Sequence, residues 1–320
     1  MPYRAGRCGH LDRQLAPARG GWHPADMGNP ISGRVVVVTG ATSGIGRATA
    51  LALAERGDSL LVVARDPARG RALIDELRAK GAGALTGLVL ADLGVLAEVR
   101  QAASEILDAT PQIDVLLNNA GVVHLERKTT QDGFEATFAV NHLAYFLLTL
   151  LLLPRLRESA PSRIVSVASD AHRFVGGMQF DDLGWERATY RSLKVYGHSK
   201  LANILFTREL ARRLAGSGVT AVCLHPGAVA TGLGRDNGIF PELVRKLIAP
   251  FMRSPASGAA TSIHLATLPD LAPHAGAYFA NLKPRSPSKA ACDDDAAARL
   301  WALSTEMCGL DARADAAVSK

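Results

Sequence analysis

Short apolar runs alternate with helical stretches along most of this chain. Seven runs are almost continuously apolar, a pattern typical of strands covered on both faces of a sheet. These runs span residues 35–40, 60–65, 85–92, 113–121, 163–169, 219–227 and 276–281. The segments between them include helical stretches at 68–80, 96–108 and 199–214. This alternation predicts an α/β fold, with one doubly wound parallel sheet of about seven strands and helices on both faces.

The chain divides into an N-terminal extension and one domain. Residues 1–30 are rich in Arg, Gly and Pro, show no periodicity and lack the apolar segment of a secretory signal. This composition predicts a flexible extension. No repeat and no Pro/Ser-rich linker interrupts residues 31–320, which we therefore interpret as a single domain.

Composition and charge argue against nucleic acid and membrane as partners. The 36 basic and 30 acidic side chains give a net charge of +6, and this surplus is spread along the chain. A diffuse surplus is typical of a solvated surface. The longest apolar run, 143–153, ends at Pro154. A bilayer span needs about 20 residues, so this run is interpreted as a buried or interface helix.

Side chains that commonly bind metals do not form a recognisable ligand set. The cysteines at positions 8, 223, 292 and 308 contain no CxxC pair. Four histidines near other motifs lack the spacing of zinc ligands: His142, His172, His198 and His225. We therefore expect no metal, and the cysteine pattern suits a reducing cytoplasm. The aspartates at 293–295 are interpreted as the N-terminal cap of a helix over 296–303.

The first predicted strand runs directly into a glycine-rich turn. The sequence there is Thr39-Gly-Ala-Thr-Ser-Gly-Ile-Gly46, followed by a helix predicted over 47–56. Glycines allow a tight turn and a close approach of backbone to a diphosphate, and the helix N-terminus offers free N–H groups. The flanking strand and helix make this more informative than three glycines alone.

Further motifs follow the later strands. They are Asp92, Asn118-Asn-Ala-Gly121, Asn141, Ser169, Tyr196-Gly-His-Ser-Lys200, Pro226-Gly227 and Thr231. With the G-x-x-x-G-x-G turn, and in this order, they resemble the short-chain dehydrogenase/reductase family over residue 31 to about residue 310. The retinol dehydrogenase and carbonyl reductase branches look most similar. The resemblance implies a Rossmann-type fold and an oxidoreductase.

The resemblance also implies a catalytic set of Ser169, Tyr196, Lys200 and Asn141. Tyr196 and Lys200 are four residues apart and share one helix face. Free tyrosine has a pKa of about 10, so we expect a nearby ammonium and a cationic nicotinamide to favour the phenolate. Ser169 would hydrogen-bond the reacting oxygen. Asn141 would position a water that links Lys200 to solvent.

The expected cofactor is NADP(H). In NAD-specific relatives an acidic residue ends the second strand, whereas this chain has Ala64 followed by Arg65, which suits a 2′-phosphate. We interpret Asp66 as the start of the following turn. The resemblance implies cofactor contacts at Gly40, Thr42, Ser43, Gly44, Ile45, Gly46, Arg65, Asp92, Leu93, Asn118, Ala120, Gly121, Tyr196, Lys200, Pro226, Gly227, Val229 and Thr231.

Two segments remain to shape a substrate pocket, 170–191 and 231–257. Family members use the second as a lid, and its apolar residues predict a hydrophobic carbonyl or alcohol substrate. The same side chains equally suit packing against the core. We therefore expect hydride transfer between NADP(H) and an aldehyde, ketone or alcohol. An enoyl reductase or epimerase, and a non-catalytic NADP sensor, remain alternatives, although the four-residue Tyr-to-Lys spacing favours the first.

A homodimer is the default expectation for assembly. In many relatives the helices that correspond to 135–153 and 199–214 form a four-helix interface between subunits.

Overall fold

The computed structural model describes residues 33–227 and 254–310, and the expected extension at 1–30 and nearly all of the expected lid lie outside this part of the chain. One sheet forms the centre of the domain, with the strand order β3-β2-β1-β4-β5-β6-β7-β8. The strands are β1 (Val35–Thr39), β2 (Ser59–Ala64), β3 (Gly87–Leu90), β4 (Val115–Asn118), β5 (Ser162–Val167), β6 (Val219–His225), β7 (Tyr278–Ala280) and β8 (Lys283–Arg285). Strands β1 to β7 are parallel, which confirms the predicted fold class.

The eighth strand is an addition that the apolar pattern did not reveal. Strand β8 pairs antiparallel with β7 through a tight turn. The two turn residues, Asn281 and Leu282, have φ values of 53° and 66°, the left-handed geometry that suits two-residue hairpins. Its sequence, Lys-Pro-Arg, buries no apolar face, so hydrophobic periodicity gave no signal for it.

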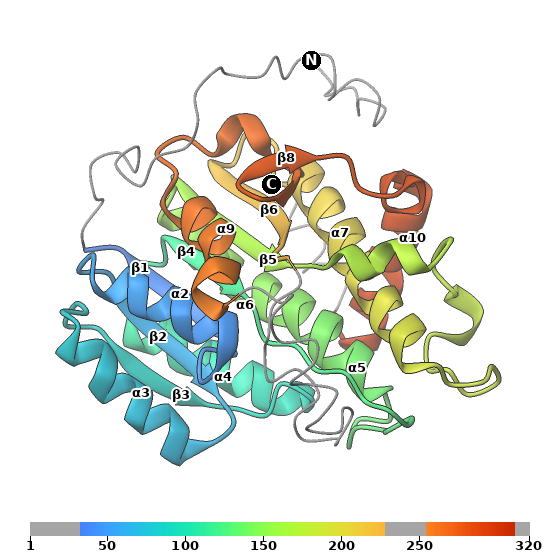
Figure 1. The fold of residues 1–320 in the computed structure, drawn as a ribbon, viewed down its shortest axis with the longest axis horizontal. Helices are drawn as coiled ribbons and strands as arrows, with labels where there is room; N and C mark the ends of the chain where they lie inside the picture. The colour runs from blue at the N-terminus through green and yellow to red at the C-terminus, as the bar shows by residue number, and fades with distance from the viewer. Residues whose placement is uncertain (1–32, 228–253, 311–320) are drawn as a thin grey trace.

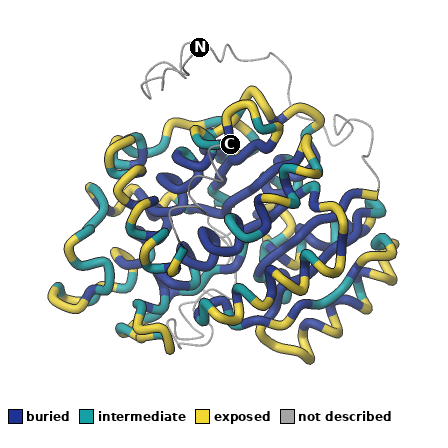
Figure 2. The backbone as a smooth tube through the Cα atoms, turned by 180° about the vertical axis from the view of Figure 1, so that it is seen from behind, coloured by how far each residue is buried: buried dark blue, intermediate teal, exposed yellow. Residues whose placement is uncertain are grey.

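Helices cover both faces of the sheet (Figure 1). One face carries α2 (Gly44–Ala54), α3 (Pro67–Ala79) and α9 (Pro255–Thr267). The other carries α4 (Leu96–Ala109), α6 (Ala144–Glu158) and α7 (Ser192–Arg213), with α10 (Asp294–Met307) packed on α7. Within β1, Val35 and Val37 join one core while Val36 and Val38 join the other. Figure 2 shows the strands as a buried centre between partly exposed helices.

Local sequence explains where several helices begin. The carboxylate of Asp66 accepts hydrogen bonds from the backbone N–H groups of Ala68 and Arg69 at the start of α3, which confirms its interpretation as a turn residue. Asp293 caps α10 in the same way, as predicted. Helix α7 begins earlier than the predicted residue 199. Its internal Gly197 is needed because a Cβ there would lie 2.7 Å from the carbonyl oxygen of Ala171.

The longest apolar run forms a core helix. A short helix, α5 (Ala136–Phe138), leads through a π-helical turn at Ala139–Leu143 into α6. By length and composition alone the stretch Ala136–Glu158 could cross a membrane, but most of it is buried inside the fold. A core helix passes the same test, and the packing agrees with the predicted buried helix.

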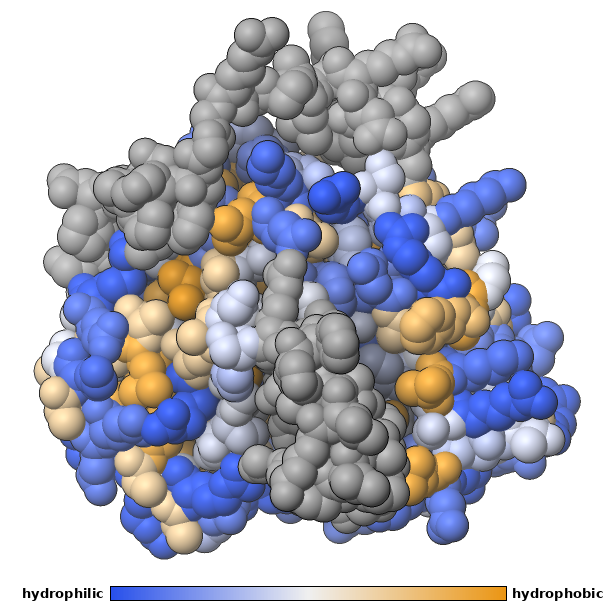
Figure 3. Space-filling view, viewed as in Figure 1, coloured by the Kyte–Doolittle hydropathy of each residue, from blue (hydrophilic) through white to orange (hydrophobic). Residues whose placement is uncertain are grey.

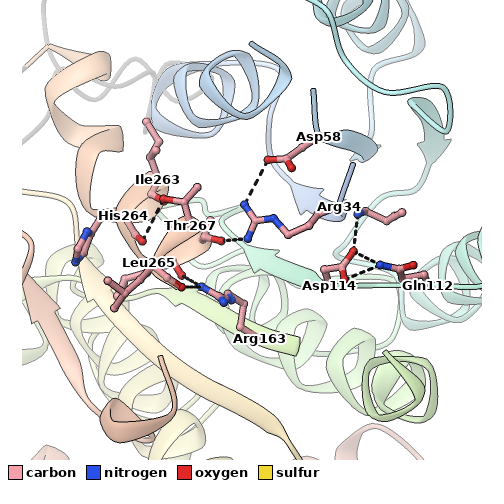
Figure 4. Close-up of polar contacts among 12 residues, drawn as sticks. Arg34, Asp58, Gln112, Asp114, Arg163, Ile263, His264, Leu265 and Thr267 are labelled. Atoms are coloured by element: carbon pink, nitrogen blue, oxygen red, sulfur yellow. Dashed lines mark hydrogen bonds and ion pairs between the residues drawn. The ribbon is translucent and has the colours of Figure 1, made fainter. Parts of the chain in front are cut away.

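Two buried arginines hold the C-terminal end of α9 (Figure 4). Arg34 donates a 2.6 Å hydrogen bond to the carbonyl oxygen of Ala266, and one guanidinium nitrogen lies 3.5 Å from the carboxylate of Asp58. Arg163 donates to the carbonyl oxygens of Leu265 and Leu268 at 3.1 and 2.6 Å. Cations are favourable at a helix C-terminus, and these carbonyls lack partners within the helix. Helix α9 packs on α2. These hydrogen bonds therefore also help to position α2, which begins in the glycine-rich turn.

The C-terminal helix covers the face that the sequence analysis assigned to a dimer. The indole of Trp301 in α10 lies 5.0 Å from the ring of Phe146 in α6 and 5.9 Å from that of Phe206 in α7, centroid to centroid. His142 and Ser304 are joined by a 2.8 Å hydrogen bond beside them. These contacts are made within one chain, and the expected homodimer stays a prediction.

Candidate active site

The glycine-rich turn between β1 and α2 is built for close backbone approach. A Cβ on Gly40, whose φ is +67°, would lie 2.6 Å from Cα of Ala120. A Cβ on Gly46 would lie 2.4 Å from both the side-chain amide of Asn119 and the carbonyl oxygen of Gly40. Ser43, which precedes α2, makes no capping hydrogen bond with its side chain. The first N–H groups of α2 thus remain available for an anion, which fits a dinucleotide diphosphate.

A hydrogen-bonded clamp joins the ends of β1 and β4. The hydroxyl of Thr39 accepts hydrogen bonds from the backbone N–H groups of Asn119 and Ala120, both at 3.0 Å. The amide of Asn119 donates back to the carbonyl oxygens of Thr39 and Gly40. Neighbouring β1 and β4 connect in opposite directions along the sheet, so the clamp lies at the switch point where such folds bind ligands.

A cleft of about 1,480 Å³ runs along the carboxyl ends of the strands. Sixteen of the predicted site residues line it: Gly40, Thr42, Ser43, Gly44, Ile45, Gly46, Arg65, Asp92, Leu93, Ala120, Gly121, Ser169, Tyr196, Lys200, Pro226 and Gly227. This volume exceeds the roughly 300–1,000 Å³ usual for one small ligand, so a cofactor and a substrate can share it. Val229 and Thr231 lie outside the described residues.

Two predicted site residues do not line the cleft. Asn118 is fully buried, and its amide donates a 3.0 Å hydrogen bond to the hydroxyl of Thr149 in α6. Its neighbour Asn119 lines the cleft instead, because successive side chains of a strand point to opposite faces. Asn141 is also buried. Its amide oxygen accepts from the N–H of Val122, and its amide nitrogen donates to the hydroxyl of Ser199.

Asn141 therefore ties three elements together. It belongs to the π-helical turn, while Val122 follows β4 and Ser199 lies in α7. A Cβ on Gly121 would lie 3.5 Å from the amide oxygen of Asn141 and 3.6 Å from the ammonium nitrogen of Lys200, so both groups border the same small space. The water relay expected for Asn141 stays a prediction.

Ser169, Tyr196 and Lys200 meet at one wall of the cleft. Ser169 follows β5, and its hydroxyl accepts a 3.2 Å hydrogen bond from the N–H of Ala171. Tyr196 and Lys200 lie on successive turns of α7, as predicted. The Lys200 ammonium nitrogen lies 5.6 Å from the Tyr196 ring centroid. These three side chains come from the β5 end and α7, two elements that pack against each other.

Burial sets the protonation of this wall. It raises the pKa of Tyr196 to about 12, against the opposing effect of a hydrogen bond with Ser169. Burial also lowers the pKa of Lys200 to about 7. Desolvation disfavours the charged form of each group. In the chain alone Tyr196 is thus a neutral phenol, in contrast to the shift towards phenolate expected from the sequence.

Two arginines border the cleft near the end of β2, the predicted Arg65 and, beyond the predicted set, Arg69. The guanidinium of Arg65 is largely exposed and lies 3.9 Å from the Asp92 carboxylate. Arg69, in the first turn of α3, donates to the carbonyl oxygen of Thr42 at 3.3 Å. Ala64 also lines the cleft. Arg69 lies four residues after Arg65, in the first turn of the next helix. This spacing in the sequence could have indicated that Arg69 also borders the cleft.

The mouth of the cleft carries exposed apolar side chains. Phe174 and Leu193 are 63% and 65% exposed and both line the cleft. They are among five large apolar residues that are exposed in the described part of the chain. On the face seen in Figure 3, apolar side chains form small patches among polar ones. Two of the five large exposed apolar side chains, Phe174 and Leu193, thus line this one cleft.

The glycine-rich turn and the Ser–Tyr–Lys wall define a nicotinamide-dependent oxidoreductase site, and comparison with known proteins agrees. The family model of short chain dehydrogenases matches residues 34–239. This chain belongs to the short-chain dehydrogenase/reductase family.

Several named relatives are similar over most of their length. Human retinol dehydrogenase 13 is 43% identical over 287 residues, which cover 88% of this chain and 86% of that protein. Mouse retinol dehydrogenase 14 is 44% identical, covering 91% of this chain and 90% of that protein. A crystal structure of an uncharacterized protein from Mycobacterium paratuberculosis superposes with a TM-score of 0.73 at 35% identity, covering 91% of this chain and 99% of that one. An NADP complex of a short chain dehydrogenase from Burkholderia cenocepacia has a TM-score of 0.63 at 25% identity, with 78% and 97% coverage.

Proposed function

We propose that this protein transfers hydride between NADP(H) and a hydrophobic aldehyde, ketone or alcohol. The observation that carries the proposal is the meeting of Ser169, Tyr196 and Lys200 on the wall of a cleft whose far end is the glycine-rich turn. Retinol dehydrogenase names among the relatives support an alcohol or aldehyde as the reacting group. The reactive carbon would lie beside Tyr196.

The protonation of Tyr196 suits the reductive direction. With its pKa raised to about 12, the phenol is a proton donor at neutral pH. It would protonate the carbonyl oxygen, while the Ser169 hydroxyl hydrogen-bonds the same oxygen as negative charge develops. The Lys200 ammonium near the ring would stabilise the phenolate left behind. NADPH supplies the hydride when it is bound.

The preference for the phosphorylated cofactor rests on the end of β2. Ala64 leaves room where an acidic side chain would repel a 2′-phosphate, and Arg65 is exposed beside it. The carboxylate of Asp66 is occupied by N–H groups of α3 and does not compete for the ribose. Arg65 would exchange its long contact with Asp92 for a bidentate contact with the phosphate.

The apolar mouth supports a hydrophobic substrate. Phe174 and Leu193 would lie against the tail of a bound molecule, since each is exposed and lines the cleft. Burying such a tail would contribute roughly 25 cal/mol for each Å² of apolar surface removed from water. A cytoplasmic location, the absence of membrane or nucleic-acid partners and a homodimer remain further proposals from the sequence.

The test is NADPH oxidation with matched panels of substrates. One panel contains aldehydes and ketones of increasing apolar length, with retinaldehyde among them, and a second contains enoyl thioesters. Turnover that rises with chain length in the first panel is expected. Turnover of the enoyl panel alone would establish the enoyl reductase alternative. NADPH binding without turnover of either panel would favour a sensor.

A further inference from the structure

A second cavity lies beside the main cleft, on another side of α7. Its volume is about 360 Å³, and its walls are the segment between Ser169 and Tyr196 and the first two turns of α7. Phe174 lines both cavities, so this one lies behind a wall of the main cleft. None of the residues so far assigned to catalysis or to the cofactor lines it.

Three basic side chains gather in this cavity. Arg191, Lys194 and His198 all line it, and their spacing of three and four residues places them on one face of α7. Tyr196 and Lys200 point to a different face, because two residues along a helix correspond to a rotation of about 200°. The basic face is thus separate from the catalytic face of the same helix.

His198 is the least exposed of the three, and it lacks a hydrogen-bond partner. It is 9% exposed, and no hydrogen bond joins its ring to any described residue. Its ring packs edge-on against Trp185 at 5.3 Å between centroids. Burial and the charge of Lys194 lower the pKa of His198 to about 4. The ring is therefore uncharged at neutral pH, and its nitrogens are not among the fully buried polar atoms without a partner, so they reach the cavity and offer one N–H to an acceptor there.

The start of α7 has no acidic side chain beside its basic residues. Arg191 precedes the first residue of this 22-residue helix and provides no side-chain cap, and the first turn contains no acidic residue. A lysine in the first turn is unfavourable beside the positive end of the helix dipole. No carboxylate lines the cavity among the described residues. Two acids of the adjoining loop have other partners: Asp182 accepts N–H groups from Glu186, Arg187 and Ala188, and Glu186 pairs with Arg127.

The loop that closes the cavity is held in an uncommon conformation. Trp185 has a φ of 52° and is 6% exposed. Left-handed backbone at a bulky residue persists only where the surroundings enforce it, and such positions cluster at ligand sites. Here the conformation places the indole against His198.

We propose that this cavity binds a small oxyanion, a phosphate or carboxylate group held by the side chains of Arg191, Lys194 and His198. One negative group there would pair with the Arg191 and Lys194 cations and accept a hydrogen bond from the neutral His198 ring. The site neither uses nor needs the NADP(H) contacts, and its occupation can be measured without turnover.

The experiment is a phosphate titration of the full-length protein, monitored by NMR of the histidine rings. The His198 signals are assigned by their loss in His198→Asn. Inorganic phosphate is expected to move these signals and to raise the pKa of His198, whereas chloride at equal ionic strength leaves them in place. Benzoate as a second arm distinguishes a carboxylate site from one selective for phosphate, and saturation by either supports the proposal.

Two lysine variants separate binding from general charge. Lys194→Gln removes a cavity charge, and Lys289→Gln removes an equally exposed charge that lines neither cavity. Lys194→Gln should raise the dissociation constant for phosphate roughly tenfold or more, and Lys289→Gln should leave it unchanged. Signals of His198 that ignore both anions, or equal weakening by the two variants, would overturn the proposal.

Discussion

The ammonium nitrogen of Lys200 donates a 2.9 Å hydrogen bond to the carbonyl oxygen of Val167, the last residue of β5. Ser169 follows two residues later, so one strand end fixes both the lysine and the serine of the catalytic wall. The bond also explains how a fully buried amine is tolerated, since the carbonyl replaces part of its lost hydration.

Tyr196→Phe should abolish the proton transfer and leave the fold intact. The change removes one hydroxyl from a partly buried ring, and general acid catalysis of this kind contributes about 10²- to 10⁴-fold to the rate. We expect kcat to fall by that factor while the NADPH dissociation constant stays within about twofold of wild type. Steady-state kinetics and fluorescence titration give the two values. A variant with wild-type kcat would show that Tyr196 is not the proton donor.

Lys200→Met should stabilise the protein while it destroys activity. The pKa of Lys200 falls from 10.5 to about 7 on burial. Between these two pH values the unfolded state binds a proton at this amine more strongly than the folded state does. The contribution of Lys200 to stability is therefore fully present above pH 10.5 and is lost as the pH falls towards 7. Urea unfolding should show that, from pH 7 to 10, the free energy of unfolding of wild type rises relative to that of the variant by up to a few kcal/mol. Parallel curves would contradict the assigned pKa shift.

Arg65→Ala should change cofactor selectivity more than activity. The guanidinium is expected to bind only the 2′-phosphate, and charge-assisted hydrogen bonds of about 1.5–3 kcal/mol imply roughly a ten- to hundred-fold loss of NADPH affinity. NADH affinity should change little. Isothermal titration of both cofactors measures the difference, with Arg71→Gln, an exposed arginine of α3 that does not line the cleft, as the control. Equal affinities for NADPH and NADH in wild type would refute the assignment.

The catalytic wall and the glycine turn were predictable because their signals are local. The Tyr196–Lys200 spacing and the glycines at 40, 44 and 46 act through one helix face and one turn, and the structure places them as predicted. The choice between Asn118 and Asn119 required the strand register, because a shift of one residue exchanges the faces. The raised pKa of Tyr196 required burial from several elements, which no local motif encodes.

The role of α10 could not be read from the sequence for a similar reason. Trp301 contacts Phe146 and Phe206, residues far away along the chain. Helix periodicity predicts that α10 has an apolar face, but not which helices it covers. The dimer interface expected at α6 and α7 came from the resemblance alone, which says nothing of how α10 packs, and it stays a prediction.

Trp301→Ala should reveal how much stability α10 provides. The indole is 2% exposed, and the guanidinium of Arg213 lies 4.3 Å from its ring centroid. Removal of such a ring from a core costs about 3–5 kcal/mol. Trp301→Phe, which keeps one ring, should cost clearly less. Urea unfolding measures both values, and a loss below about 1 kcal/mol for alanine would show that α10 is only loosely attached.

His142 should make the fold sensitive to acid. Complete burial lowers its pKa from 6.5 to about 3, and its ring nitrogen Nε2 lies 2.8 Å from the hydroxyl of Ser304 in α10. A depressed folded-state pKa means that this contribution is fully present above pH 6.5. It is lost as the pH falls towards 3, because the unfolded state binds the proton first. The full loss would approach roughly 4–5 kcal/mol at about 1.4 kcal/mol per pH unit.

His142→Gln keeps a hydrogen-bonding group near Ser304 without the titration, so its stability should fall less steeply between pH 6.5 and 4 than that of wild type. Chemical unfolding across that range gives the two slopes, and wild type as shallow as the variant would show that His142 takes up its proton without unfolding the chain.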